Sequence, residues 1–163
     1  MIPARPLDHI RSWRDAARWR AAQVGRVVFT NGVFDLLHPG HIDVIHGARA
    51  CGDVLIVGIN SDESVRRLKG AERPVRSAAD RAYVLAALAA VDCVAVFGQD
   101  TPLELIQLLT PDVIVKGGDY DPDTVVGAAE TRARGGEVVI IPLSPGHSTS
   151  ATIAKLRPGN ADV

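Results

Sequence analysis

The residues best suited to chemistry lie together in one short stretch, His38-Pro39-Gly40-His41. Its two histidines are three positions apart, so at the start of a helix both imidazoles can face one ligand. Imidazoles donate hydrogen bonds to phosphate oxygens, and more strongly when they are protonated. The glycine lets the backbone approach a ligand closely, and the proline stiffens the turn. The stretch therefore predicts a phosphate-binding site.

The flanking residues predict that this stretch joins a strand to a helix. Residues 27–30 form a short apolar run suited to a buried parallel strand, and residues 41–50 have the pattern of a helix that stops near Gly52. A helix N-terminus after a strand offers unpaired backbone N–H groups and the positive end of the helix dipole to an anion. The motif thus stands where α/β proteins bind phosphate.

Other motifs that bind metals or phosphates fit this turn less well. A zinc-protease signature needs a glutamate after the first histidine and a spacing of four, whereas the spacing here is three. Neither a GxGxxG fingerprint nor a Walker A loop follows the first strand. Isolated histidines are more often structural, and we interpret His9, His46 and His147 in that way, although His147 also adjoins a motif discussed below.

Apolar strand patterns alternate with helix patterns along the rest of the chain. Four more strands are expected, at residues 54–59, 93–97, 113–115 and 138–141. Such alternation implies a parallel sheet with a crossover helix between successive strands. We therefore predict a single-domain α/β fold, a Rossmann-like doubly wound parallel five-stranded sheet that binds ligands at the carboxyl ends of its strands.

Capping residues, prolines and glycines indicate where the helices begin and end. Residues 77–80 resemble a capping box before a helix that runs to about Ala90. Further helices are expected from Thr101 and Pro102, from Asp121 and Pro122 as far as Gly135, and from near Ser148. A helix over residues 7–22 carries several arginines, and packing on the domain or a neighbouring subunit is favoured over a basic anchor. We divide the chain into an N-terminal helical extension (1–25), the domain that carries the motif (26–157) and a loose tail (158–163).

Size and cysteine content indicate an ordinary globular protein. A chain of 163 residues with 47% hydrophobic and 23% charged residues fits one domain with a substantial core. The two cysteines, Cys51 and Cys93, lie far apart and among apolar neighbours. Buried free thiols are therefore favoured over a disulfide or a metal site.

Charge and hydropathy exclude several partners. The formal net charge of -1 provides no positive field that would attract nucleic acid or a membrane surface. The apolar runs are too short to span a bilayer, and no apolar segment follows the N-terminal arginines as it would in a signal peptide. We therefore expect a cytoplasmic protein that binds neither nucleic acid nor membrane.

Six further motifs accompany the histidine stretch, at residues 30–35, 57–62, 67–70, 73–75, 91–92 and 116–120. Together they resemble the HxGH signature and surroundings of the cytidylyltransferase-like nucleotidyltransferases, over about residues 27–156. Within that superfamily, the Lys-Gly-Gly-Asp-Tyr run and the Asn-Ser-Asp strand end resemble the D-glycero-β-D-manno-heptose 1-phosphate adenylyltransferases, the transferase half of ADP-heptose synthase.

The resemblance implies a reaction and its substrates. The enzyme would transfer AMP from ATP to a sugar 1-phosphate, D-glycero-D-manno-heptose 1-phosphate, and form ADP-heptose and pyrophosphate. A CTP-dependent enzyme acting on glycerol 3-phosphate or a similar phosphoalcohol is the alternative within the class. A non-catalytic nucleotide-binding module is the alternative outside it, and the presence of His38, His41 and Lys69 argues against that reading.

The resemblance also implies roles for individual residues. The catalytic residues would be His38, His41 and Lys69, with Lys69 in a mobile loop between Leu68 and Arg76. Without the resemblance, Lys69 would be interpreted as a solvated lysine. The nucleotide-binding residues would be Phe29, Thr30, Gly40, Lys116, Gly117, Asp119, Ser148, Thr149 and Ser150. The substrate-binding residues would be Asn31, Asp35 and Arg73. Of the nucleotide-binding residues, Gly117 and Asp119 lie in a stretch, residues 117–119, that could alternatively be only a tight turn.

The last motif departs from the family pattern. Many relatives carry an arginine before a Ser-Thr-Thr helix start, whereas this chain has His147 followed by Ser148, Thr149 and Ser150. Hydroxyl and N–H groups at a helix start still suit a β- or γ-phosphate. His147 is the candidate to replace some of the missing positive charge.

The implied chemistry requires no acid–base pair. A sugar phosphate is largely dianionic near neutral pH, because its second pKa is about 6. It can attack the α-phosphorus directly, so the enzyme supplies alignment and charge stabilisation for an in-line displacement. We expect Mg²⁺ to arrive on ATP rather than in a protein metal site. In the heptose family the transferase can be fused behind a sugar kinase, and here we expect a separate kinase chain and a possible homodimer.

Overall fold

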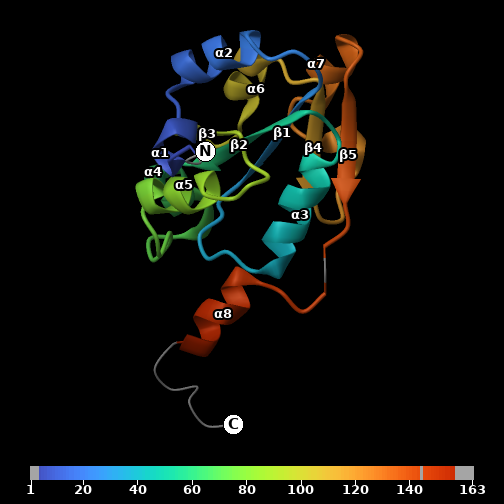
Figure 1. Cartoon of the computed structure of the whole chain (residues 1–163). Coiled ribbons are helices and arrows are strands. Elements are labelled where there is room, and N and C mark those ends of the chain that lie inside the picture. The colour runs from blue at the N-terminus through green and yellow to red at the C-terminus, as the bar shows by residue number, and fades with distance from the viewer. Residues whose placement is uncertain (1–3, 144, 157–163) are drawn as a thin grey trace.

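A five-stranded, entirely parallel sheet forms the centre of the molecule in the computed structural model, which describes residues 4–143 and 145–156 (Figure 1). The strands are β1 (Val27–Gly32), β2 (Val54–Asn60), β3 (Cys93–Phe97), β4 (Val113–Gly117) and β5 (Glu137–Ile141). This confirms the predicted Rossmann-like parallel sheet in a single α/β domain. Residues 158–163, expected as a loose tail, lie outside the described residues.

The order of the strands, β3-β2-β1-β4-β5, places β1 in the middle of the sheet. Val28 of β1 pairs with Leu55 of β2 on one side and with Val113 of β4 on the other. From β1 the chain first adds strands on one side, and then crosses to the other side for β4 and β5. The gap above the carboxyl ends of β1 and β4 is therefore the topological switch point, where sheets of this type bind ligands.

Helices cover both faces of the sheet (Figure 1). They are α1 (Pro6–His9), α2 (Trp13–Ala21), α3 (Pro39–Arg49), α4 (Asp62–Lys69), α5 (Ala78–Ala86), α6 (Leu103–Leu109), the 3₁₀ turn η1 (Pro122–Thr124), α7 (Ala128–Ala133) and α8 (Thr149–Leu156). Helices α3 and α5 contribute to the core on one face, and α2, α6 and α7 contribute to the core on the other. No helix of the described chain is long and apolar enough to cross a bilayer.

The two cores follow from the alternation of side chains along the strands. Val28 lies in one core, whereas Val27 and Phe29, its neighbours in β1, lie in the other. All three side chains are fully buried. A strand covered on both faces needs apolar residues at successive positions, which is why residues 27–29 read as a continuous apolar run.

The N-terminal segment differs from the single helix expected over residues 7–22. It forms α1 and α2, separated at Ile10, which makes an isolated parallel bridge to Val94 of β3. Ser12 then caps α2 by accepting a hydrogen bond from the Asp15 amide, and the Trp13 indole N–H donates to the Val96 carbonyl at 2.7 Å. Pairing with β3 and the cap at Ser12 together stabilise two short helices more than one continuous helix. The segment packs on its own domain.

Three other sequence expectations need correction. Lys69 does not lie in a loop, because Ser61 caps a helix, α4, that ends at Lys69. The helix expected from Asp121 to Gly135 is broken, because Gly127 adopts a left-handed conformation, with φ +82°, between η1 and α7. Cys93 is buried as predicted, but Cys51 is partly exposed.

The remaining helix boundaries shift by a few residues. The helix expected to run to about Ala90 ends at Ala86, and the helix expected from Thr101 begins at Leu103 with Pro102 as its cap. The last helix begins at Thr149, close to the expected start near Ser148. These shifts leave the order of strands and helices unchanged.

Candidate active site

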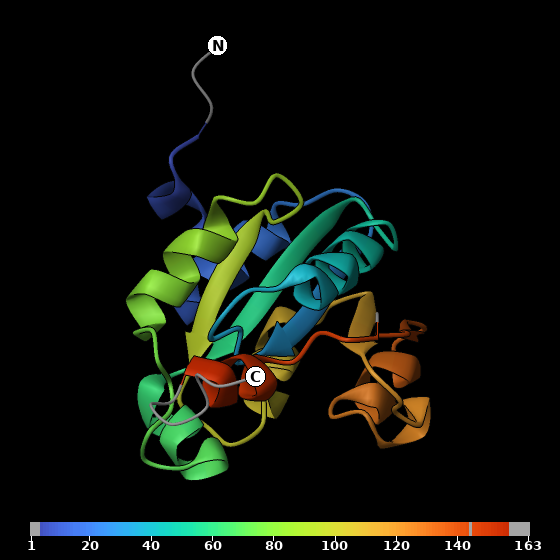
Figure 2. The ribbon, with the colours of Figure 1, turned by 90° about the horizontal axis from the view of Figure 1, so that it is seen from below.

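A cavity of about 810 Å³ opens at the carboxyl ends of β1, β2 and β4. Its walls come from the turn after β1, the end of α4, the segment after it and the start of α8. Figure 2, seen from below, shows α8 lying across this end of the sheet. The cavity therefore occupies the switch point that the strand order creates.

The two histidines of the central motif stand at the start of α3. His38 is the N-cap residue and His41 is the third residue of the helix, and their rings stack with centroids 3.8 Å apart. The His38 backbone N–H donates to Nδ1 of His41 at 3.3 Å. Because Nδ1 of His41 accepts this bond, the neutral ring carries its proton on Nε2. The capping interaction thus fixes the tautomer of His41 and leaves Nε2–H as the donor available to a ligand.

Both imidazoles are neutral at pH 7 in the free protein. Burial, assisted by the neighbouring His38, lowers the pKa of His41 to about 4. Burial and then the neighbouring His147 lower the pKa of His38. Nδ1 of His38 is buried and has no hydrogen-bond partner among the described residues. The pair therefore offers a ligand neutral hydrogen-bonding groups rather than fixed positive charges.

A third histidine completes a row of three rings. His147 lies before α8, and its ring is 5.9 Å from that of His38 and nearly parallel to it. It is exposed and lines the same cavity. The structure thus brings together His38, His41 and His147, although they come from segments more than a hundred residues apart.

The start of α8 supplies a second helix N-terminus to the cavity. The Ser148 hydroxyl accepts a hydrogen bond from the Ala151 amide at 3.3 Å. The Thr149 hydroxyl donates to the Leu36 carbonyl at 3.3 Å, which ties α8 to the turn after β1. Two helix N-termini, those of α3 and α8, therefore face one space, and each favours bound negative charge.

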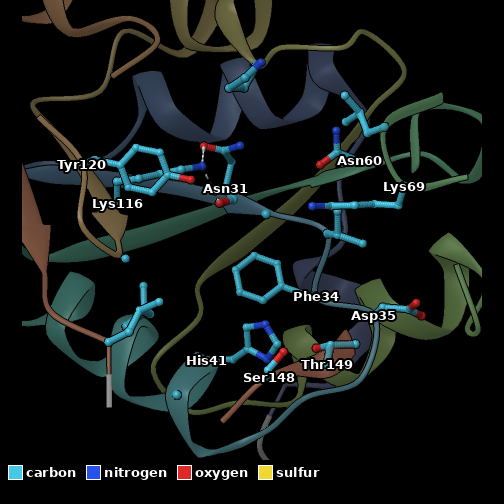
Figure 3. A pocket seen from close by; sticks show the side chains of 18 of the residues that line it. Asn31, Phe34, Asp35, His41, Asn60, Lys69, Lys116, Tyr120, Ser148 and Thr149 are labelled. Carbon is cyan, nitrogen blue, oxygen red and sulfur yellow. Dashed lines mark hydrogen bonds between the residues drawn. The ribbon is translucent and has the colours of Figure 1, made fainter. Parts of the chain in front are cut away.

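Lys116, at the end of β4, is a partly buried cation. Its ammonium donates to the backbone carbonyl of Asn31 at 3.3 Å and to the Asn31 side-chain oxygen at 3.1 Å (Figure 3). No ion pair with a carboxylate is formed within the described chain. Burial lowers the pKa of Lys116. An anionic ligand would relieve this uncompensated charge.

Lys69 approaches the cavity from the opposite side. It is the last residue of α4, and its side chain extends toward the space around Phe34 and Asn31 (Figure 3). Unlike Lys116 it is exposed. Two lysines, one from the end of α4 and one from the end of β4, therefore flank the position between the histidines and β1.

Asp35 and Arg73 form a buried ion pair beside the cavity, with Nε of Arg73 2.7 Å from the carboxylate. The backbone amides of Val75 and Arg76 donate to the same carboxylate at 2.9 Å. Burial alone would raise the pKa of Asp35, but the two amides and Arg73 outweigh it and hold that pKa below its ordinary value. Asp35 is therefore ionised at neutral pH.

Phe34 holds the turn after β1 in an unusual conformation. Its φ of +49° lies in the left-handed region, which costs a residue other than glycine roughly 1–3 kcal/mol. The residue is 5% exposed, and its ring centroid lies 5.4 Å from that of His41. The Phe34 ring thus packs against the His41 imidazole in a tilted arrangement.

Arg81 is a functional neighbour that the sequence reasoning missed. Its side chain is fully buried and donates to the carbonyls of Val33, Asn60 and Arg76 at 2.7, 2.9 and 3.0 Å. It also pairs with Asp62. Nothing in its local sequence, the second turn of a helix, distinguishes it from a surface arginine.

Asn60 and Tyr120 also line the cavity, although they were part of recognised motifs and no site role was predicted for them. Asn60 stands at the carboxyl end of β2, a position that the predicted sheet already assigned to the ligand-binding edge. Its side-chain amide donates to the Ser64 hydroxyl at 2.9 Å. A search of all strand ends for polar residues would have found Asn60.

Most of the predicted site residues meet at this cavity. Those on its walls are His38, His41, Lys69, Gly40, Lys116, Gly117, Ser148, Thr149, Ser150, Asn31, Asp35 and Arg73. Phe29 and Thr30 do not line it, because their side chains are buried within the sheet. Asp119 is exposed beyond the end of β4 and does not line it either. Contact of these three with a nucleotide stays a prediction.

Comparisons with known proteins agree with this geometry. Residues 29–157 match the cytidylyltransferase-like family. The chain is 59% identical over 143 residues to "Bifunctional protein HldE" of Acidiphilium cryptum, covering 87% of this chain and 29% of that protein. It is 53% identical over 155 residues to the protein of the same name from Gluconacetobacter diazotrophicus, covering 95% and 32%. The chain thus spans less than a third of the length of these relatives.

Two solved structures share the fold. The lipopolysaccharide core biosynthesis protein from Thermoplasma volcanium is 26% identical, with a TM-score of 0.60, over 74% of this chain and 98% of that chain. Pantoate-beta-alanine ligase from Francisella tularensis is 15% identical, with a TM-score of 0.63, over 86% and 68%. The second likeness is one of fold alone.

Proposed function

This chain belongs to the cytidylyltransferase-like family of nucleotidyltransferases, and from that premise we propose that it transfers AMP from ATP to a heptose 1-phosphate. The supporting observation is the convergence of two helix N-termini, two lysines, an arginine and three histidines on one cavity. Such a site suits a ligand with several phosphates. The identity to the HldE proteins and the likeness to a lipopolysaccharide core biosynthesis protein support the sugar acceptor.

The reaction is a displacement at phosphorus. An oxygen of the sugar phosphate attacks the α-phosphorus of ATP, a new P–O bond forms, and the bond to the β-phosphate oxygen breaks so that pyrophosphate leaves. The attacking phosphate is largely dianionic at neutral pH and needs no general base. The buried carboxylate near the cavity, Asp35, is fully engaged by Arg73 and two amides, as expected where no base is required.

The triphosphate is proposed to lie between the histidines and Lys69. Nε2–H of His41 and the N-termini of α3 and α8 would bind its oxygens from one side, and the Lys69 ammonium from the other. These donors are held in place before the reaction, so they stabilise the charge that develops in the transition state without reorganising. Because there are several such donors, the site can bind a triphosphate strongly even though the imidazoles carry no positive charge in the free protein.

Magnesium is proposed to enter with ATP. The described residues contain no group of three His, Cys, Asp or Glu side chains that could hold a metal ion. The two carboxylates on the cavity wall, Asp35 and Asp100, are already paired with Arg73 and Arg67. Mg²⁺ commonly binds through substrate phosphates and keeps several waters. In that state it would neutralise the pyrophosphate as it leaves.

The acceptor is proposed to bind beside Asn31 and Arg73. Because this acceptor is a sugar 1-phosphate, its supply requires a sugar kinase, which we propose as the partner enzyme in the same reaction sequence. Association of this chain into a homodimer is a further proposal that the oligomeric state in solution would test.

A substrate panel read out by pyrophosphate release tests the proposed function. ATP, CTP and GTP are each paired with heptose 1-phosphate, glycerol 3-phosphate and phosphoethanolamine. ATP with heptose 1-phosphate should exceed CTP and GTP by about tenfold or more in kcat/KM, because a mismatched base edge leaves buried polar groups unpaired. Preference for CTP with glycerol 3-phosphate would assign the alternative activity. No turnover with any pair would favour a nucleotide-binding module.

A further inference from the structure

Both oxygens of the Asp35 carboxylate are engaged within the protein, and the side chain is closed to a substrate by burial. Oδ1 accepts from the amides of Val75 and Arg76, and Oδ2 accepts from the Val75 amide and from Nε of Arg73. A carboxylate offers about four lone-pair sites, and three N–H donors already reach this one, with the Val75 N–H shared between both oxygens. The side chain is fully buried, and in Figure 3 it points away from Phe34 and His41.

Arg73 is in the opposite situation. Its Nε is engaged by Asp35, but its two η nitrogens have no hydrogen-bond partner among the described residues. The side chain is 14% exposed and lines the cavity. The η nitrogens carry four N–H donors in one plane, which matches two oxygens of a phosphate.

The backbone that carries Arg73 is fixed from a second direction. The buried Arg81 donates to the carbonyl of Arg76 and to that of Val33 in the turn after β1. By contrast, residues 66–72 are exposed, and Gly70, with φ +97°, has nothing within 4 Å of its Cβ position. Of the segment expected to be a mobile loop, the part at residues 73–76 is therefore anchored to the body of the site.

We propose that Asp35 is a positioning residue that does not contact substrate, and that it orients Arg73 so that both η nitrogens bind the phosphate of the acceptor. This inference rests on the proposed function, because the acceptor phosphate is the ligand. It replaces the expected role of Asp35 as a direct sugar contact. The charge of Asp35 holds the guanidinium by one nitrogen and leaves the other two for the ligand.

Steady-state kinetics of Asp35→Asn test this role. Asparagine keeps the shape but loses the charge, and its NH₂ group opposes N–H donors. KM for the acceptor should rise about tenfold to a hundredfold, the loss expected for misdirected charge-assisted hydrogen bonds, while KM for ATP and kcat at saturating acceptor change less than about threefold. Glu137→Gln is the matched control. Glu137 pairs with Arg26 at the amino-terminal end of the strands, away from the cavity, so this change should alter none of these constants.

A double-mutant cycle separates positioning from general support. If Asp35 acts through Arg73, Asp35→Asn should add less than about twofold to the acceptor KM in an Arg73→Ala background. Fully additive effects would overturn the inference. Arg73→Lys provides a test that does not depend on the folding of an Asp35 variant. The three N–H donors of lysine are on a single nitrogen, so lysine cannot pair with Asp35 and also present two coplanar nitrogens to two phosphate oxygens. The acceptor KM should therefore rise, and an unchanged KM would also overturn the inference.

Binding of inorganic phosphate distinguishes failure of this inference from failure of the proposed function. With a non-hydrolysable ATP analogue and Mg²⁺ bound, phosphate is titrated while the Arg73 Nε–H resonance and the exchange of the Val75 and Arg76 amides are followed by NMR. Weaker phosphate binding in Asp35→Asn and Arg73→Ala would support positioning even if heptose 1-phosphate were not a substrate. Unchanged phosphate affinity with faster amide exchange would mean that Asp35 supports only the fold, and would overturn the proposal.

Discussion

The protonation state and hydrogen-bonding capacity of each residue at this site depend on its immediate contacts more than on its residue type. His41 is a hydrogen-bond donor of known tautomer because the His38 amide occupies its Nδ1, and it is neutral because it is buried. Lys116 has no carboxylate partner in the described chain, whereas Asp35 is fully buried and hydrogen-bonded on both oxygens. The same cavity thus holds one cation ready for an anionic ligand and one anion closed to ligands.

Replacing either histidine should impair turnover far more than stability. We expect His38→Ala and His41→Ala each to lower kcat about 10²- to 10³-fold, the usual loss for one preorganised donor to a charged transition state. Thermal unfolding followed by circular dichroism should change little, since both residues stand at a helix start that keeps its backbone. Near-normal turnover in both variants would remove the histidines from the catalytic machinery.

Acidification should destabilise the free protein through His41. Its pKa is about 4 in the folded chain and 6.5 ordinarily, so the unfolded chain binds more protons between these values. Stability from this residue is complete above about pH 6.5 and is lost as the pH falls toward 4. The melting temperature should therefore fall over this window, and His41→Asn should make the dependence shallower. His46→Asn, a change at an exposed position of α3, serves as control, and an equal flattening there would contradict the assignment.

Among the elements, the turns that join strands to helices are held together by a buried guanidinium. Arg81 in α5 binds carbonyls from the turn after β1, from the end of β2 and from the segment after α4. Its position lets one side chain satisfy three carbonyls that would otherwise be buried without partners. Helix α5 therefore holds the segments around the cavity in place through Arg81, although no residue of α5 lines the cavity.

Removing this guanidinium should cost much more than removing a surface one. Arg81→Met should lower the free energy of unfolding by roughly 3 kcal/mol or more, because it strands buried carbonyls and Asp62. Arg132→Ala should cost less than about 1 kcal/mol, since its pair with Asp123 is exposed. Urea denaturation of both variants measures the difference. Equal losses of unfolding free energy would show that the hydrogen bonds of Arg81 do not stabilise the fold more than an exposed ion pair does.

For the whole molecule, the position of β1 at the centre of the sheet decides where the ligand binds. The crossing from β2 and β3 on one side to β4 and β5 on the other opens the cavity, and α3 and α8 close it with their N-termini. The site is rich in cations and helix dipoles and poor in free carboxylates. These features suit phosphate groups and support the proposal that Mg²⁺ enters with ATP.

Metal dependence should accordingly come from the nucleotide. Protein purified without nucleotide should contain no stoichiometric metal by elemental analysis. Turnover should vanish with EDTA and return with Mg²⁺, because the ion binds the phosphates of the substrate. Zinc bound tightly at His38 and His41 would overturn this expectation.

Local sequence determined the elements and the chemistry of the central motif. The apolar runs at residues 27–30 and 54–59 predicted buried parallel strands, and the His38-Pro39-Gly40-His41 stretch predicted an anion site at a helix start. Both signals are local, because a strand buried on two faces and a helix N-terminus each impose their own residue pattern over a few positions. The cavity at the carboxyl ends of the strands followed from that pattern.

Tertiary structure alone decided how the polar residues are paired. Asp35 meets Arg73 across 38 positions, Lys116 meets Asn31 across 85, and Arg81 reaches β2 and the turn after β1. The break at Ile10 likewise depends on an edge strand, β3, that lies far along the chain. Periodicity carries no record of strand order, and a polar side chain acquires its partner only when that order brings two distant loops together. The sequence therefore predicted residues most of which line one cavity, and the fold shows which of their polar groups are already engaged with other residues.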